Sequence, residues 1–425
     1  MVPLLARLFA CLPAESLIVR RSLLSLPFLA LLALAGASNR ENATRFYKGN
    51  THTHTLWSDG TAAPEHTVDW YAKRDYDFLV LSDHNTLQDT ERWFPVSEDG
   101  KGRLPDAQLE HLRRQWGADS VQLRERKGEE GREMRLHTLT ELREQFGRKG
   151  EFLLVQGEEV TAHWRQTEPT KVNYPVHINA INLGGLVKPR GGDSPRDLMN
   201  KALAAIQERG KLDGKPVMAH VNHPNFGWGL TWEDLAHMQH DRFFEVHNGH
   251  QGVRNRGDEA HPSTEVMWDR ANLLRVTSLD LPLLYGVATD DAHDLWGDRP
   301  VSRPGRGWIM VRASELSGDA LVVAMQRGDF YGSSGVTLND FSSTDGRYSV
   351  DVVARDGVET SVQFYGAREG GEAGELLYET SNNPAVYEYK AGDLFVRAKV
   401  VSDRAKDDGA WADETEAAWL QPVKP

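Results

Sequence analysis

Side chains that can bind metal ions recur along this chain where short apolar segments end. They are His52, His54, Asp83, His84, Asn85, Glu158, Glu159, His177, His220, His223, Glu245, His247, Asp290, Asp291 and His293. Buried strands usually end in Gly, Pro, Asn or Ser, which suit turns, so imidazoles and carboxylates at these places are a functional signal. Both groups are ligands of catalytic divalent ions. The pattern predicts a multinuclear metal hydrolase.

The first two of these histidines belong to one expected strand. His52 and His54 are two residues apart, so both side chains point to the same face. Their Cα atoms would lie about 6–7 Å apart, which lets both imidazoles reach one ion. A His-Thr-His sequence also arises by chance and is weak evidence alone. Asp59 and His84, which follow in order at further segment ends, make the signal specific.

The apolar segments that carry these residues alternate with helical patterns. We expect strands over residues 46–50, 78–81, 152–155, 176–181, 216–219, 243–246 and 284–288, and helices over 64–74 and 197–209. Strands that alternate with helices imply a parallel sheet, and seven such units imply closure into a barrel. The strand ends of such a barrel meet at one mouth. The expected fold is α/β, a distorted (β/α)7 TIM-like barrel over residues 46–335.

Two further regions differ from this rhythm. Residues 97–150 are dense in Glu, Arg and Lys, which predicts a charged helical insertion. We favour a solvated surface excursion over a segment lying across the site. Residues 339–425 contain alternating apolar and polar stretches typical of half-buried antiparallel strands, as in 348–353, 360–365 and 394–400. They predict a small β-sandwich-like C-terminal domain that supports the barrel.

The first residues have the features of a targeting segment. Arg20-Arg21 precede an apolar run from Leu23 to Ala35, and small residues follow it, which predicts a secretory signal peptide over residues 1–37. The run is too short to favour a membrane span, so no stable membrane anchor is expected after cleavage. Export would use the Sec or the twin-arginine route, to an extracytoplasmic location. The single cysteine, Cys11, precedes the run, so stability is expected from the core and the metals.

The overall charge limits the class of partner. The formal net charge is −13, and no block is dense in Lys or Arg. Duplex nucleic acid is therefore a poor partner. A small-molecule substrate is expected, and a small anion is compatible because bound divalent ions invert the local charge.

Several motifs together resemble one family. Residues 52–60 (HTHTLWSDG) and 81–85 (LSDHN) resemble the opening motifs of the PHP family, named for polymerase and histidinol phosphatase. Residues 157–161 (GEEVT), 176–179 (VHIN), 222–225 (NHPN) and 291–293 (DAH) resemble its later motifs. The likeness covers about residues 48–335. Residues 307–311 and 328–335 look more like the carbaryl-hydrolase-like branch of secreted metallohydrolases.

This resemblance implies two or three divalent ions (Mn, Zn or Fe) and assigns their ligands. His52, His54, Glu159 and Asp291 would hold one ion and its water; Glu159 would bridge to a second ion with His177 and His223; and Asp59, His84 and His293 would hold a third. Many members have His where this chain has Asp59. This departure leaves the filling of the third position open, and a harder oxygen ligand favours Mn²⁺ or Fe²⁺ somewhat.

The neighbours of these ligands leave alternatives. Asp83, Asn85 and Asp290 are expected to orient ligands by hydrogen bonds. Glu159 is preferred to Glu158 by its Gly-x-Glu spacing, and His223 to His220 because Pro224 follows it. A hydrogen-bonded core polar group is the alternative for each ligand. His247 and His250 are left without a role, and the substrate-binding residues are unknown. Solvated loop charge is the preferred interpretation of Arg254, Arg256, Arg299, Arg303 and Arg306.

The sequence thus predicts an exported metal-dependent phosphoesterase. It would hydrolyse small phosphomonoesters or phosphodiesters with a water whose pKa the metals lower. One alternative is a carboxylic ester or carbamate hydrolase with the same metal centre, which the resemblance to the branch favours. A non-enzymatic, metal-dependent binding module is the other.

Overall fold

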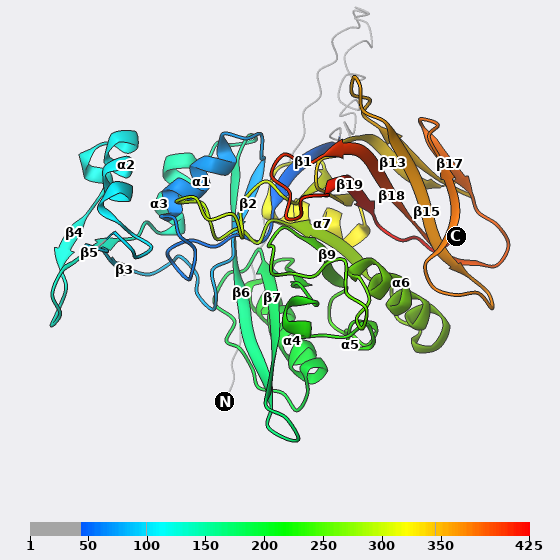
Figure 1. Cartoon of the computed structure of the whole chain (residues 1–425), viewed down its shortest axis with the longest axis horizontal. Helices are drawn as coiled ribbons and strands as arrows, with labels where there is room; N and C mark the ends of the chain where they lie inside the picture. Colours follow the sequence, from blue (N-terminus) through cyan, green and yellow to red (C-terminus); the bar gives the residue numbers. More distant parts are fainter. Residues whose placement is uncertain (1–43, 99, 345) are drawn as a thin grey trace, which may run out of the picture. The chain divides into compact units, whose positions relative to one another are not determined.

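The computed structural model of the protein describes residues 44–98, 100–344 and 346–425. The protein has a mixed α/β fold with a large central sheet and several helices (Figure 1). The predicted signal peptide over residues 1–37 and Cys11 lie outside the described residues. In the part of the chain that the structure describes, no helix is both long and apolar enough to cross a bilayer.

The first half of the sheet contains the seven expected strands. In spatial order they are β10 (Tyr285–Thr289), β9 (Phe243–Asn248), β8 (Met218–Val221), β7 (Val172–Ile181), β6 (Leu153–Gln166), β2 (Phe78–Leu81) and β1 (Arg45–Asn50). Each overlaps the apolar run that predicted it. β1, β2 and β6 pair in parallel, as do β8, β9 and β10. Their carboxyl ends therefore lie at the same edge of the sheet.

One strand runs against the others, which corrects the expectation of a parallel sheet. β7 is antiparallel to both β6 and β8. The reason is the connection: only residues 167–171 join β6 to β7, too few for the crossover that a parallel pair needs. The two strands form a long hairpin (Figure 1). His177 consequently lies inside β7, opposite Thr161, and not at a strand end.

The helices that follow these strands or, for α7, β11 bury one face each. They are α1 (Pro64–Ala72), α4 (Pro195–Asp213), α5 (Trp232–Ala236), α6 (Thr264–Leu274) and α7 (Gly318–Arg327). α4 begins where the Ser194 side chain accepts a hydrogen bond from the Asp197 N–H, and it ends at Gly214 with a φ of 67°. Its Leu203 and Ile206 are fully buried in the core against β7. Each such side chain contributes about 1.5–3 kcal/mol by burial.

The two ends of this seven-strand row approach each other at the edge where the carboxyl ends lie. Thr53 and Ala292, which follow β1 and β10, form a parallel bridge, and the His54 N–H donates to the Ala292 carbonyl at 2.9 Å. Among the described residues β10 and β1 share no continuous ladder, so the row is not closed by strand pairing.

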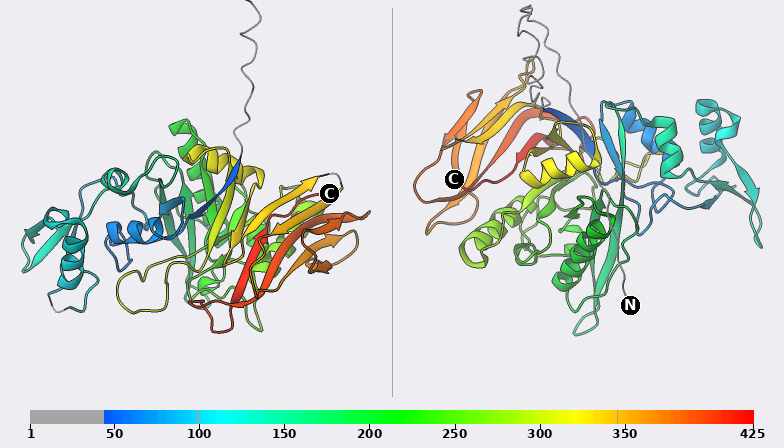
Figure 2. Two further views of the ribbon diagram at one scale, coloured as in Figure 1. Left: turned by 90° about the horizontal axis from the view of Figure 1, so that it is seen from above. Right: turned by 180° about the vertical axis from the view of Figure 1, so that it is seen from behind.

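The sheet continues from β1 into the C-terminal region. β11 (Trp308–Ala313), β12 (Phe330–Ser333), β19 (Thr415–Leu420), β18 (Asp393–Ala405), β15 (Thr360–Arg368) and β16 (Glu375–Thr380) follow in that order, all antiparallel. A second sheet contains β13 (Leu338–Thr344), β14 (Arg347–Val352) and β17 (Ala385–Glu388). The two sheets are seen from two further sides in Figure 2. An apolar cluster that includes Tyr348 and Phe364 joins them. Arg397 and Asp269, paired at 2.7 Å, tie β18 to α6.

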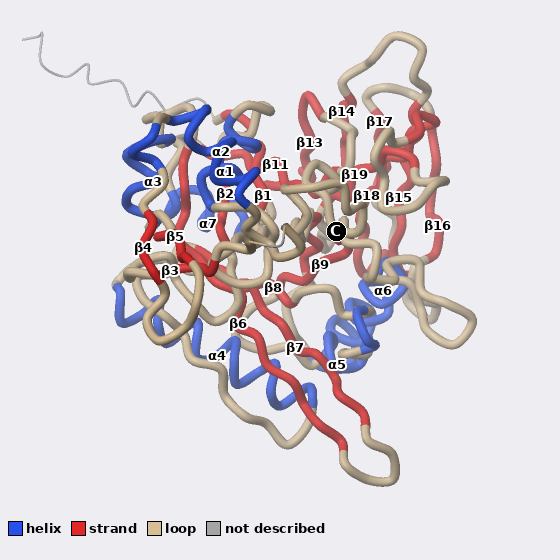
Figure 3. The backbone as a smooth tube through the Cα atoms, turned by 60° about the vertical axis from the view of Figure 1, so that its left-hand side comes forward, coloured by secondary structure: helices blue, strands red, loops and turns tan. Residues whose placement is uncertain are grey.

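The charged segment between β2 and β6 is not the solvated helical excursion that we expected. It contains a sheet, β3 (Trp93–Pro95), β5 (Arg132–Arg135) and β4 (Leu123–Glu125), besides the helices α2 (Asp106–Trp116) and α3 (Leu139–Phe146) (Figure 3). Leu104, Leu109, Leu112 and Met134 form a buried cluster with Leu56 and Trp57. Its apolar residues are few but converge, and this convergence was not visible in the composition.

Candidate metal centre

The structure brings all nine predicted ligands together at the edge where the parallel strands end. Their ligand atoms form four overlapping groups, each with atoms within 4.8 Å of one another: His54, Asp59, His84 and His293; His52, Glu159 and His223; His52, His54 and Asp291; and His84, Glu159 and His177. Residues separated by some 240 positions thus share one place.

Glu159 lies at the centre of this arrangement. Its Oε1 is 3.0 Å from His177 Nδ1 and 3.6 Å from the Nε2 atoms of His52 and His223. Its Oε2 is 2.6 Å from His84 Nδ1. A carboxylate that faces imidazoles with each oxygen has the geometry of a bridge between two cations.

Two further carboxylates face the same histidines. Asp291 Oδ1 lies 3.1 Å from His52 Nε2 and 3.4 Å from His54 Nε2. Asp59 lies 3.5 Å from His54 Nδ1, 3.4 Å from His84 Nε2 and 3.3 Å from His293 Nε2. His54 therefore faces carboxylates with both nitrogens: Asp59 with Nδ1, and Asp291 and Glu159 with Nε2.

Several nitrogens of the centre are buried without a hydrogen-bond partner among the described residues. They are Nε2 of His52, His54 and His177. A buried polar atom without a partner is costly, so such atoms are normally satisfied. Convergent imidazole nitrogens and carboxylate oxygens are a donor set that fits divalent Zn, Mn or Fe. The site is therefore built to bind divalent cations.

The protonation of these groups supports this interpretation. Burial by itself would raise the pKa of Glu159, but the surrounding imidazoles, His84 first, hold it well below its usual value. Burial would lower the pKa of His84, yet Glu159 and Asp59 raise it to about 11. The carboxylates thus require positive charge beside them. A bound divalent cation supplies that charge and displaces the protons.

The backbone is strained at three positions of the centre. Asn85, His223 and Asp291 have φ values of 49°, 25° and 49°, in the left-handed region that non-glycine residues rarely adopt. Such strain costs free energy and is concentrated at functional sites. Two of the three, His223 and Asp291, are predicted ligands, and the third follows His84 directly.

A residue that we had not assigned, Glu245, orients one of the ligands. Its Oε1 accepts a hydrogen bond from His52 Nδ1 at 2.7 Å and from Thr289 Oγ1 at 2.7 Å, and its Oε2 accepts one from the His223 N–H at 2.8 Å. The proton on Nδ1 leaves His52 Nε2 with a free lone pair toward the centre. The only signal for Glu245 in the sequence was its position at a strand exit.

None of the three residues predicted to orient ligands contacts a predicted ligand imidazole directly. Asp83 accepts hydrogen bonds from the Thr55 N–H at 2.8 Å and from Ser58 Oγ at 2.7 Å, and that hydroxyl lies 3.3 Å from His54 Nδ1. Asn85 pairs with the backbone of Thr161 at 2.9 and 3.0 Å.

Asp290 contacts no imidazole. It accepts hydrogen bonds from Asn50 Nδ2 at 2.6 Å and the Tyr71 hydroxyl at 2.9 Å, and from the Arg306 and Gly307 N–H groups. It joins β1 to the chain entering β11. Any effect of Asp290 on the ligands is therefore indirect.

The two alternative ligands point elsewhere. Glu158 Oε1 accepts a hydrogen bond from the Val187 N–H at 2.6 Å, on the opposite face of β6, and burial raises its pKa to about 7. His220 Nε2 lies 3.0 Å from Thr51 Oγ1. Glu159 and His223 are the members of each pair that face the centre.

A cleft of about 340 Å³ opens onto the centre. Besides ligands, its lining includes Phe226, Val301, Arg299 and His250. His250 Nδ1 accepts a hydrogen bond from the Gly252 N–H at 2.9 Å. Because that nitrogen accepts, the proton of the neutral ring is on Nε2, and His250 is an N–H donor at the cleft.

The other residues that the sequence singled out lie away from the cleft or at its rim. Arg299 is 70% exposed and 3.8 Å from Asp294. His247 stacks on Trp419 with ring centroids 4.9 Å apart. Arg256 pairs with Asp413, and Arg303 and Arg306 with Asp408. Arg254 lies over the ring of Trp228, which stacks on His261.

Comparisons with known proteins give distant structural matches. No family model and no curated protein matches the chain. One similar structure is a two-domain protein from Bacteroides vulgatus described as containing a predicted PHP-like metal-dependent phosphoesterase (TM-score 0.38, 16% identity, covering 89% of this chain and 95% of that one). Another is a candidate metal-dependent phosphoesterase from Bifidobacterium adolescentis (TM-score 0.29, 15% identity, covering 60% and 90%). Neither description mentions carbaryl hydrolase, so that part of the resemblance stays a prediction.

Proposed function

We propose that this protein is a metal-dependent phosphoesterase of the PHP type that hydrolyses small phosphomonoesters or phosphodiesters. The observation that supports it most directly is Glu159, whose two oxygens face imidazoles on either side. Cations held by His52, His54, Glu159, Asp291, His177 and His223 would supply Lewis acidity and lower the pKa of a water nucleophile. Asp59, His84 and His293 would hold a third.

The charge of the centre favours a phosphate ester over an uncharged ester. Its ligand groups contain three carboxylates, Asp59, Glu159 and Asp291, which do not neutralise two or three divalent cations. The loaded ligand set would therefore keep a net positive charge, which favours an anionic substrate and offsets the charge of its transition state. His250 Nε2–H would donate to a substrate oxygen, and Glu245 would keep His52 in its productive tautomer.

The alternative, hydrolysis of a carboxylic ester or carbamate, uses the same centre. Its support is the likeness of residues 307–311 and 328–335 to the carbaryl-hydrolase-like branch. Phe226 and Val301 give the cleft an apolar side that an aryl group would contact. A non-enzymatic binding module has less support, because every predicted ligand faces the centre.

A substrate panel separates these functions. Aryl phosphate, bis-aryl phosphate, aryl ester and aryl carbamate substrates would be tested with Mn²⁺, Zn²⁺ or Fe²⁺, and metal content measured in parallel. We expect phosphate ester turnover to dominate, with Mn²⁺ or Fe²⁺ favoured by the oxygen ligand Asp59. Faster ester or carbamate turnover would establish the alternative. No turnover by fully metal-loaded protein would leave the binding module.

We also propose that the seven strands form a distorted, incompletely closed (β/α)7 barrel. The bridge between Thr53 and Ala292 supports this, because it joins the first strand to the seventh at the metal end. An experimental structure in which the chains after β1 and β10 lie apart would contradict it.

Export is a further part of the proposal, and it rests on the sequence of residues 1–37 alone. A fusion of this segment to a reporter protein tests it. The reporter should be found outside the cytoplasm, and replacing Arg20-Arg21 by Lys-Lys would separate twin-arginine from Sec export.

A further inference from the structure

Asp59 is the ligand whose place depends most on the loop that carries it. Its side chain is 53% exposed, whereas the side chains of the histidines that it faces are at most 25% exposed. Packing around the carboxylate therefore does little to fix it. The turn Thr55–Gly60, closed by a hydrogen bond from the Gly60 N–H to the Thr55 carbonyl at 3.0 Å, determines where Asp59 lies.

The charged insertion holds this turn by its carbonyl groups. Arg103 Nη1 donates to the Ser58 carbonyl at 2.6 Å and to the Gly60 carbonyl at 3.2 Å, so one guanidinium nitrogen binds the residues on either side of Asp59. Gln108 continues the contact: it donates to the Thr61 carbonyl at 3.1 Å and accepts a hydrogen bond from the Ala63 N–H at 2.7 Å.

The insertion also buries the apolar residues of the turn. Leu56 and Trp57 are 0% and 1% exposed, and their cluster contains Leu104, Leu109 and Met134 of the insertion. Trp57 Nε1 donates to the His137 carbonyl at 3.0 Å. The turn is thus held between the central sheet and the insertion.

The opposite side of the turn is tied to the centre itself. The Thr61 N–H donates to the His293 carbonyl at 2.8 Å. A Cβ atom at Gly60 would lie 2.6 Å from the backbone of His54, so a larger residue there would push the turn away. These ties fix where the turn begins and ends, and Arg103 binds its tip.

We propose that the insertion, residues 97–150, is a positioning element for the third cation, with Arg103 as its positioning residue. This inference rests on the proposed metal centre. Without Arg103 the two carbonyls beside Asp59 lose their shared donor, and the carboxylate is no longer held opposite His54, His84 and His293. Affinity for the third cation falls because its ligands must be ordered when it binds. The other two positions do not use Asp59 and keep their cations.

Manganese binding tests the proposal without relying on activity. The full-length protein and the variants Arg103→Met, Asp59→Asn and Arg124→Met would be stripped with chelator and titrated with Mn²⁺. Free Mn²⁺ would be measured by electron paramagnetic resonance, and bound Mn²⁺ by elemental analysis. Arg124 is the matched control, because it belongs to the insertion but pairs with Glu133, away from the turn.

We expect the wild-type protein and Arg124→Met to bind three Mn²⁺ ions. Asp59→Asn should bind two, and Arg103→Met should bind the third about tenfold or more weakly, within the range for groups that orient ligands. Thermal unfolding and the two retained cations report whether each variant is folded. If Arg103→Met does not fold, Arg103→Gln, which keeps a polar but shorter side chain, replaces it.

Two results would overturn the inference. One is a folded Arg103 variant that binds the third Mn²⁺ with the affinity of the wild-type protein. The insertion would then not position this cation, even if Asp59→Asn loses it. The other is a wild-type protein that never binds more than two Mn²⁺ ions in excess metal. In both cases the two-cation centre and the proposed hydrolysis would stand. Loss of all Mn²⁺ binding by the wild type would instead contradict the metal centre.

Discussion

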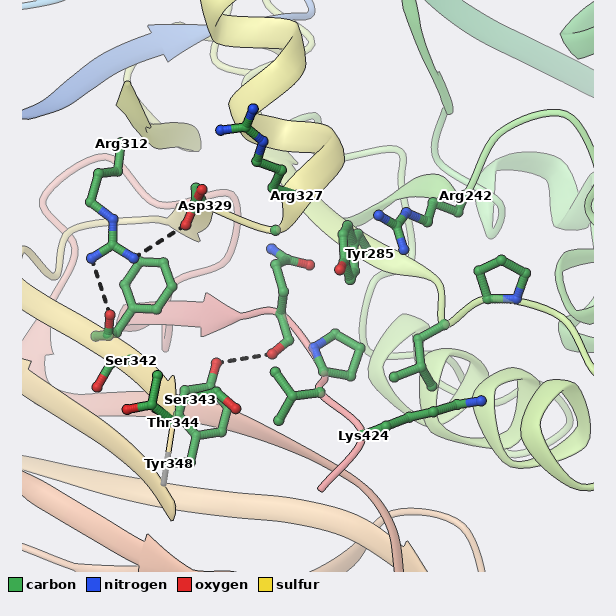
Figure 4. Close-up of a pocket in the computed structure, with 17 residues that line it drawn as sticks. Arg242, Tyr285, Arg312, Arg327, Asp329, Ser342, Ser343, Thr344, Tyr348 and Lys424 are labelled. Atoms are coloured by element: carbon green, nitrogen blue, oxygen red, sulfur yellow. Dashed lines mark hydrogen bonds and ion pairs between the residues drawn. The ribbon is translucent and has the colours of Figure 1, made fainter. Parts of the chain in front are cut away.

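The cleft over the metal centre and the cavity at the opposite edge of the sheet differ in the side chains that line them, and their volumes do not reveal this difference. The opposite cavity is larger, about 630 Å³ against about 340 Å³, and lies where β9, β10 and β12 begin (Figure 4). Three of its charged groups, Arg242, Arg312 and Asp329, contact neighbouring side chains. Arg312 pairs with Asp340 and Asp329, and Arg242 lies 4.0 Å from the ring of Tyr285.

The smaller cleft has what the larger cavity lacks among the described residues: converging ligand atoms. Each of the metal-capable groups lies at the cleft's end of the sheet. That end also has left-handed backbone at Asn85, His223 and Asp291 and buried nitrogens without partners. Converging unsatisfied atoms, with strained backbone at neighbouring positions, distinguish this site from a mere gap between elements, and volume does not.

The strongest test of this comparison removes the central carboxylate. Glu159→Gln keeps the size of the side chain but replaces a charged ligand that faces imidazoles with both oxygens. We expect the variant to lose at least two cations and about 10³-fold or more in turnover of its best substrate, because the water loses its activation. Elemental analysis and initial rates would measure both losses.

Arg327→Ala is the control for that substitution, because Arg327 lines the larger cavity. Metal content and rate should equal those of the wild-type protein. If Arg327→Ala impaired turnover as much as Glu159→Gln, the larger cavity would be functional and the comparison would be wrong.

The second largest effect on metal binding is expected at Glu245, which contacts the predicted ligand His52 but is not itself a predicted ligand. Glu245→Gln leaves an acceptor for Thr289 and weakens the hold on the Nδ1 proton of His52. Metal affinity or activity should fall about 10- to 100-fold, the range for such partners. Competition with a chelator measures the affinity. Wild-type affinity in Glu245→Gln would show that the strand, and not this carboxylate, orients His52.

These residues show what the sequence could and could not predict. The convergence of these side chains was predictable because most of them combine metal-binding residue types with strand ends, and the Gly-x-Glu spacing selected Glu159, which faces the centre, over Glu158. The direction of β7 was not predicted, because an antiparallel hairpin and a parallel strand have similar apolar patterns. The hydrogen bonds of Arg103, Glu245 and His250 depend on long-range contacts, which no local pattern encodes.

A smaller effect is expected at the wall of the cleft. A Cβ atom at residue 252 would lie 2.9 Å from His250 Nδ1, so Gly252→Ala should displace the ring and its Nε2–H donor. We expect both His250→Ala and Gly252→Ala to raise KM about 3- to 10-fold, with a smaller change in kcat, as expected for the loss of one hydrogen bond. Initial rates and competition by inorganic phosphate measure this.

Gly191→Ala is the matched glycine control, because a Cβ atom there meets nothing within 4 Å. Metal content should be unchanged in all three variants. An unchanged KM and phosphate affinity in His250→Ala would show that the substrate does not contact this imidazole.

A buried atom without a hydrogen-bond partner is not by itself evidence of a metal site, and Glu158 provides the test. Glu158 Oε2 is buried without a partner among the described residues, like the nitrogens of the centre, but it lies in none of the ligand groups. Burial raises the pKa of Glu158 from 4.5 to about 7. The Glu158 carboxyl therefore holds its proton more tightly in the folded state than in the unfolded state. The stabilisation from this difference is complete below about pH 4.5 and is lost as the pH rises through about 7.

Glu158→Gln is neutral at every pH and keeps an acceptor for the Val187 N–H. Its free energy of unfolding should exceed that of the wild-type protein by about 1–3 kcal/mol at pH 8, and the gain should vanish near pH 4.5, since one pKa unit corresponds to about 1.36 kcal/mol. Urea unfolding at several pH values measures the difference, and metal content should not change. A stability difference independent of pH would show that ionisation of Glu158 is not its source. If Glu158→Gln lost metal, Glu158 would be part of the centre. The convergence of ligand atoms would then be a weaker criterion for separating the cleft from the rest of the molecule.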